Sequence, residues 1–179
     1  MNKKIKEYNT LMCSVFLDSI KIGNCKNISL SANDKSYFSE SYESVCDFIE
    51  QQKSPAFIIS YSEKNKRQSL TPHTDDIIRE AINNVYYLKF HSLINTAIIN
   101  SMESSSGNYF FWFSDNKSFQ KISSLSFKEL IHAICNYSIQ INLIYRPSEI
   151  LIMDIKKLNR SDVIAIYLKS RMAMCCKEK

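Results

Sequence analysis

The stretch Tyr145-Arg146-Pro147-Ser148-Glu149-Ile150-Leu151 is typical of the start of a helix. Pro147 suits a first helical position, because its missing N–H would have no partner there. Further along, Asp162-Val163-Ile164-Ala165-Ile166-Tyr167-Leu168 predicts a second helix, and Lys169-Ser170-Arg171-Met172 begins a third. Two short helices and the start of a third, joined by polar turns, are the outline of a DNA-binding helix-turn-helix.

The positive charge of the chain is concentrated in this C-terminal part. Residues 145–179 hold eight Lys or Arg and four Asp or Glu, which makes +4 of a whole-chain net charge of +5. Basic charge therefore collects where a phosphate backbone would be contacted. The alternative interpretation of the charge alone is a solvated basic tail.

Length and composition bound the class of protein. A chain of 179 residues, 45% hydrophobic and 23% charged, can bury one sizeable core plus a small appendage. The longest apolar runs, such as 109–113, are too short to span a bilayer, and no cleavable signal follows the basic N-terminus. We therefore expect a cytoplasmic protein without membrane contact.

The small number of glycines and the scattered positions of Cys and His argue against phosphate-binding loops and metal sites. Two glycines cannot form a phosphate-binding loop, and six cysteines without a Cys-x-x-Cys pair and three scattered histidines give no metal-ligand spacing. We expect no cofactor, no metal site and no catalytic residue. A hydrolase built from Cys46 or Cys25 with His73 or His91 is kept as a lower alternative.

Apolar runs and helical periodicity alternate along the first 135 residues. Helices are predicted from Ser39 to Gln52, from Thr74 or Asp75 to Asn84, from His91 to Met102 and from Ser124 or Ser126 to Tyr137. Strands are predicted at Thr10–Leu17, Asn27–Ala32, Pro55–Tyr61, Val85–Phe90 and Tyr109–Ser114. This alternation predicts an α/β domain over 1–135, with a five-stranded parallel sheet covered by helices on both faces. A packed connection over 136–144 and an all-α helix-turn-helix over 145–179 follow.

The order of these parts resembles bacterial response regulators of the LuxR/FixJ class, and most closely the enterobacterial capsule and fimbrial regulators with a degenerate receiver. Tyr145–Glu149 is similar to the family's Leu-Thr-Pro-x-Glu, and Val163–Leu168 is similar to its Glu-Ile-Ala-x-x-Leu helix. Arg146 stands where the family has a capping threonine, and the usual turn glycine is absent. The family continues through a longer recognition helix and a fourth helix, so the resemblance implies an incomplete DNA-binding module ending at Lys179.

The resemblance also implies a receiver without phosphoryl chemistry. Only Asp18 follows the first predicted strand, and the third predicted strand ends Ser60-Tyr61-Ser62 without a carboxylate. Without an acidic cluster neither Mg²⁺ nor a phosphoryl group has ligands. Lys117 is similar to the receiver lysine, and a lone surface lysine is the plainer interpretation.

These inferences predict a non-enzymatic transcription regulator that dimerises with itself or a related regulator and contacts DNA. An adaptor that forms mixed dimers without binding DNA is the main alternative, and a cysteine-dependent bacterial effector enzyme is the lower one. The residues expected to contact DNA are Lys156, Lys157 and Arg160 toward phosphates, and Lys169, Ser170, Arg171 and Lys177 on or near the recognition helix.

Overall fold

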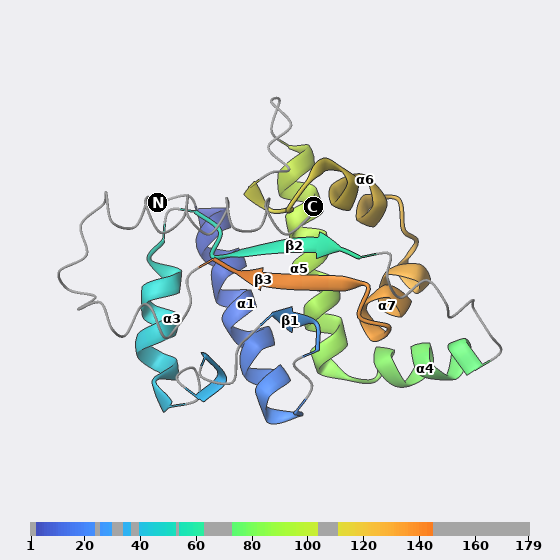
Figure 1. Cartoon of the computed structure of the whole chain (residues 1–179), viewed down its shortest axis with the longest axis horizontal. Helices are drawn as coiled ribbons and strands as arrows, with labels where there is room; N and C mark the ends of the chain where they lie inside the picture. Colours follow the sequence, from blue (N-terminus) through green and yellow to red (C-terminus); the bar gives the residue numbers. More distant parts are fainter. Residues whose placement is uncertain are drawn as a thin grey trace.

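The computed structural model describes residues 3–23, 26–29, 34–36, 40–52, 54–62, 73–103 and 111–144, which form mainly helices around one small sheet (Figure 1). In chain order the elements are α1 (Lys3–Lys21), β1 (Ile28–Ser29), α3 (Tyr42–Glu50), β2 (Phe57–Tyr61), α4 (His73–Ile82), α5 (Val85–Met102), α6 (Asn116–Ser123), α7 (Phe127–Cys135) and β3 (Ile139–Leu143). Among these helices, none has both the length and the apolar character that a membrane span requires.

The sheet is small and mixed. Its strand order is β1-β3-β2, and β3 runs parallel to β1 but antiparallel to β2. The expected five-stranded parallel sheet with helices on both faces is therefore wrong. Within 111–114, the predicted aromatic strand is reduced to one isolated parallel bridge between Phe113 and Ile59.

Two of the predicted strands are helical. Thr10–Leu17 lies inside α1, and Val85–Phe90 is the first part of α5. A short apolar run fits a buried strand and a buried helix equally well, so only a longer window separates them. At the start of α5, the Asn84 side chain accepts a hydrogen bond from the backbone N–H of Tyr86 at 2.9 Å, an N-cap that begins a helix rather than a strand.

Other predicted elements are confirmed. The helix expected over Ser39–Gln52 is α3, the helix expected to start at Thr74 or Asp75 is α4, and Pro55–Tyr61 contains β2. The last helix is α7, and its N-cap Ser126 forms a reciprocal capping box with Glu129.

The expected connection at 136–144 instead supplies the central strand, β3. Its residues Ile139, Ile141 and Leu143 are buried, and they alternate with less buried polar residues, as on a sheet with one apolar face. The Asn27 amide fixes the turn before β3 by donating to the backbone oxygens of Ile134 and Ile139, at 2.8 and 3.0 Å. Sequence periodicity missed this strand because it is short and half polar.

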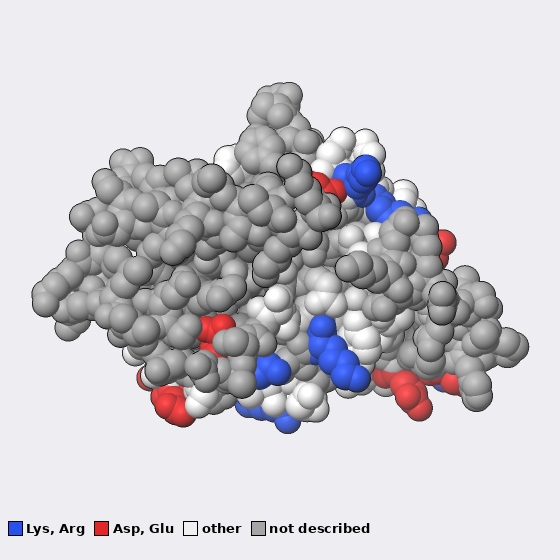
Figure 2. Space-filling view, viewed as in Figure 1, with Lys and Arg blue, Asp and Glu red and all other residues white. Residues whose placement is uncertain are grey.

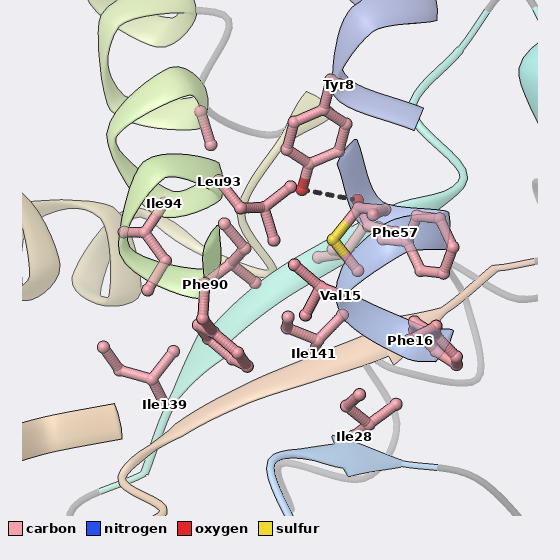
Figure 3. Close-up of a cluster of buried hydrophobic side chains, with 14 of the residues drawn as sticks. Tyr8, Val15, Phe16, Ile28, Phe57, Phe90, Leu93, Ile94, Ile139 and Ile141 are labelled. Atoms are coloured by element: carbon pink, nitrogen blue, oxygen red, sulfur yellow. Dashed lines mark hydrogen bonds between the residues drawn. The ribbon is translucent and has the colours of Figure 1, made fainter. Parts of the chain in front are cut away.

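Helices α1 and α5 pack against one face of the sheet and against each other (Figures 1 and 3). In the close-up of Figure 3, aromatic and aliphatic side chains from both helices meet those of β2 and β3. Burying each large apolar side chain contributes about 1.5–3 kcal/mol before entropy costs. The buried residues labelled there are Tyr8, Val15, Phe16, Ile28, Phe57, Phe90, Leu93, Ile94, Ile139 and Ile141.

Polar contacts at both ends tie α1 to α5 in antiparallel orientation. At one end, the Lys4 ammonium pairs with the Glu103 carboxylate. At the other end, Lys89 Nζ lies 2.6 Å from Asp18 Oδ2 and 2.9 Å from Ser14 Oγ. These contacts, together with the apolar core, fix which side of α5 faces outward.

Candidate association face on helix α5

The residues expected to contact DNA lie outside the described part of the chain. This holds for Lys156, Lys157 and Arg160 and for Lys169, Ser170, Arg171 and Lys177, as it does for the whole segment 145–179. Their role stays a prediction from the sequence. Among the described residues, Lys, Arg, Asp and Glu are interspersed rather than gathered in one basic patch on the face shown in Figure 2.

The positions compared with a phosphoryl receiver do not form one site. Asp18 lies on α1, where it pairs with Lys89. Ser60 and Tyr61 belong to β2, and Lys117 lies in the first turn of α6. Because Thr10–Leu17 lies inside α1, the described residues lack the first of the strand ends that a receiver site requires.

The structure does not bring Cys46 together with His91, the cysteine and histidine of one of the alternative hydrolase pairs. A hydrogen bond joins the buried thiols of Cys46 in α3 and Cys13 in α1. The Tyr42 hydroxyl also contacts Cys46. The hydrogen bond from Cys13 lowers the pKa of Cys46, while the same contact and burial raise the pKa of Cys13. His91 instead lies on α5 against other partners. Cys25 and the side chain of His73 are outside the described residues.

A metal site is not found in the described ranges. No group of three or more His, Cys, Asp or Glu side chains in them could hold a metal ion. An open depression of about 510 Å³ follows the outer side of α1 and is lined by Lys3, Lys6, Glu7, Thr10, Leu11 and Ser14. Its lining comes from a single solvent-facing helix, so it offers no converging chemical groups.

Helix α5 has two apolar faces, and only one of them is buried. The inner face packs on the core through Tyr86, Phe90, Leu93, Ile94, Ala97 and Ser101. The outer face lies on the opposite side of the helix, within an arc of about 100° at 3.6 residues per turn. A surface helix normally places polar residues there, and a helix that is apolar all round is normally buried.

The outer face, defined here by six residues, is apolar at both ends and polar in the middle. Val85 and Met102 are 62% and 61% exposed, and Leu88 and Ile99 are 40% and 55% exposed. Ser92 is exposed and Asn95 is half-buried. In order along the helix the six residues are Val85, Leu88, Ser92, Asn95, Ile99 and Met102, which alternate three and four positions apart.

His91 lies at one edge of the outer face. The Asn95 amide nitrogen lies 3.2–3.3 Å from the ring nitrogens of His91, and the His91 ring packs edge-on against Phe127 of α7, with centroids 4.8 Å apart. Burial lowers the pKa of His91. None of the six residues of the face has an ionisable side chain, and Lys89 at the other edge is paired with Asp18.

Sequence reasoning missed this face because it divided 85–102 into a strand and a helix. The signal was nevertheless present: the three-and-four spacing from Val85 to Met102 runs unbroken across the supposed boundary at Phe90–His91. This heptad-like spacing is typical of a helix that pairs with another helix.

Comparison with known proteins adds no relative to this picture. No family model, no curated protein and no solved structure matches the chain. The resemblance to LuxR-type regulators stays a hypothesis that rests on the sequence of residues 145–172.

Proposed function

We propose that this protein is a non-catalytic association module, and that the outer face of α5 is the surface through which it binds another protein. The observation that carries the proposal is that the exposed apolar residues Val85, Leu88, Ile99 and Met102 share one side of α5, two at each end of a small polar centre. This retains the expected dimerising or adaptor role without a receiver fold.

The arrangement of the exposed residues supports the proposal more than their number does. Single exposed apolar side chains are normal on any protein, and Ile22 after α1, at 47% exposed, is such a case. Exposed apolar residues that are grouped on one side of an element, with polar groups beside them, favour an interaction site. The four apolar residues of the outer face share one side of one helix, whereas Ile22 has no such companions on α1.

The described cysteines fit the cytoplasmic location that the sequence predicts. Cys13, Cys46 and Cys135 are free thiols, and burial raises the pKa of Cys135 to about 11. A thiol in that state is a poor nucleophile at neutral pH. We accordingly keep the cytoplasmic location as part of the proposal.

Site-specific photocrosslinking in the cells that produce the protein tests this association. A benzophenone amino acid at position 99 should give a discrete crosslinked product, because Ile99 would lie inside the interface. The same amino acid at position 22 is the matched control and should give none. The same weak background from both positions would contradict an association face on α5.

Contact with nucleic acid through the basic segment 145–179 is the second candidate function. The net charge of +4 in 35 residues favours it, because each phosphate contact releases a counterion and makes binding strongly dependent on salt. Such binding would be weak, and it would discriminate poorly between sequences.

Binding to a chosen duplex and to a scrambled duplex, each at two salt concentrations, tests this second function. Replacing Lys169 and Arg171 with Ala should weaken both complexes to a similar extent and reduce the salt slope by about two. The control replaces Lys3 and Lys6, two exposed lysines of α1, and should change neither. Equal effects of the two double variants would show that the whole surface, not residues 145–179, attracts the phosphates.

A further inference from the structure

We infer that the partner of the outer face of α5 is a second copy of this chain, docked with its own α5 antiparallel across a two-fold axis. This inference rests on the proposed association function and names its partner. Closed two-fold dimers are the commonest assembly of identical chains, and they require one surface that is complementary to itself.

The outer face meets that requirement because the order of its apolar and polar residues is the same from either end of the helix. In an antiparallel pair whose axis passes between Ser92 and Asn95, Val85 faces Met102 of the second copy and Leu88 faces its Ile99. Each Ser92 then faces an Asn95. Apolar side chains therefore meet apolar ones at four layers, and the two central layers pair a hydroxyl with an amide.

Side-chain length favours this antiparallel pairing over a parallel one. The end layers and the central layers each combine a shorter with a longer side chain, Val with Met at the ends and Ser with Asn at the centre, and the layers between them pair Leu with Ile. A parallel pair would place Ser92 opposite Ser92 and Asn95 opposite Asn95, so one central layer would join two short side chains and the other two longer ones. The dipoles of the two helices also interact favourably only in the antiparallel arrangement.

The polar centre gives the pair its register. A polar residue at an interior position of a helix pair fixes alignment and lowers stability. Sliding the helices by one turn would place Asn95 against Leu88 in one direction and Ser92 against Ile99 in the other, so that a polar side chain would lose its partner. Ser92 and Asn95 thus select one alignment of the apolar ends.

The size of α5 sets the strength of the contact. Eighteen residues make a helix of about 27 Å, whose outer side offers on the order of 300 Å². Stable complexes bury about 800 Å² per partner, so the pair should be weak and reversible, with a dissociation constant of roughly 10–100 µM.

Charge exchange across the proposed layer of Leu88 and Ile99 tests the inference. Leu88→Glu and Ile99→Lys, each alone, put a charge opposite an apolar side chain and should weaken self-association at least tenfold in sedimentation equilibrium. The chain carrying both substitutions places Glu against Lys in two layers. It should recover to within a few-fold of the unmodified protein at low salt, and lose that recovery at high salt.

Two comparisons keep the result interpretable. Ile22→Glu introduces the same charge at a comparably exposed isoleucine outside the face and should leave self-association unchanged, and circular dichroism should give the same helix content for every variant. A parallel pair would juxtapose like charges in the double variant, so a double variant as monomeric as the single variants overturns the antiparallel register.

An unmodified chain that does not self-associate at several hundred micromolar overturns the second copy as partner. If a crosslinker at position 99 then captures a different protein, the association function stands and only its partner was misassigned. If position 99 captures nothing, both fail.

Discussion

Helices α1 and α5 lie side by side on the same face of the sheet, yet their outward sides differ. The outward side of α1 carries Lys3, Lys6, Glu7 and Thr10, whereas that of α5 carries Val85, Leu88, Ile99 and Met102. Both helices bury an apolar inner side in one core, so folding alone accounts for the inner sides. The outer side of α1 is what solvent favours, whereas that of α5 is accounted for by the second surface that we propose to cover it.

The largest effect is expected on the inner side of α5. Phe90→Ala removes a fully buried ring that packs near Tyr86, with centroids 5.8 Å apart, and should cost about 3–5 kcal/mol of unfolding free energy in urea. Ile99→Ala, measured at low protein concentration, should cost less than about 0.5 kcal/mol. Similar losses for the two variants would mean that the outer side is part of the core and would remove the contrast with α1.

Loss of the N-cap of α5 should have the next largest effect. Asn84→Ala removes the acceptor for the Tyr86 N–H and should lower the unfolding free energy by about 1 kcal/mol. Since Val85 and Leu88 follow directly, fraying this end should also weaken self-association. Asn84→Ser, which keeps a capping oxygen, is the control and should restore most of both properties.

The ion pair that fixes α5 against α1 should contribute less. Lys89→Met keeps the aliphatic stem but leaves the Asp18 carboxylate, at 24% exposed, without its ammonium partner. We expect a loss of up to about 1 kcal/mol that shrinks as salt is added. Lys3→Met removes a fully solvated pair with Glu7 at 3.7 Å and should change nothing measurable. Equal effects would show that the Lys89 pair does not fix the two helices.

The smallest effect concerns the histidine at the edge of the outer face. Because burial lowers the pKa of His91, the unfolded chain takes up a proton more readily than the folded chain. His91 therefore does not reduce the stability of the fold above the unfolded pKa of about 6.5. As the pH falls below that value, protonation of the unfolded chain lowers the stability. His91→Gln should flatten the decline in melting temperature between pH 7 and pH 5. An unchanged pH profile would place the cause of the decline elsewhere.

The sequence predicted well those elements whose ends carry distinct local signals. Ser126 with Glu129 marks the start of α7, and Pro55 precedes the β-branched run of β2. It failed where an apolar run was read through a short window, as at Thr10–Leu17 and Val85–Phe90. Windows of six to eight residues cover only about two helical turns, so a buried helix and a buried strand have the same local appearance there.

The missing central strand and the missed association face have a common physical origin. β3 is recognisable only through its partners, since Ile141 pairs with both Ile28 and Ile59 from distant parts of the chain. The outer face of α5 is likewise recognisable only in the folded chain, because it depends on Leu88 and Ile99 remaining exposed. Exposure is a property of the folded chain, so the sequence could supply the spacing of this face but not its exposure.

The molecular mass of the unmodified chain in solution, measured by sedimentation equilibrium as a function of concentration under reducing conditions, is the most direct test of the account. We predict a mass of 20.8 kDa at about 1 µM that approaches twice this value at several hundred micromolar, and an Ile99→Glu chain that stays near the monomer mass. A mass of 20.8 kDa at every concentration, with the variant indistinguishable from the unmodified chain, would contradict pairing through α5.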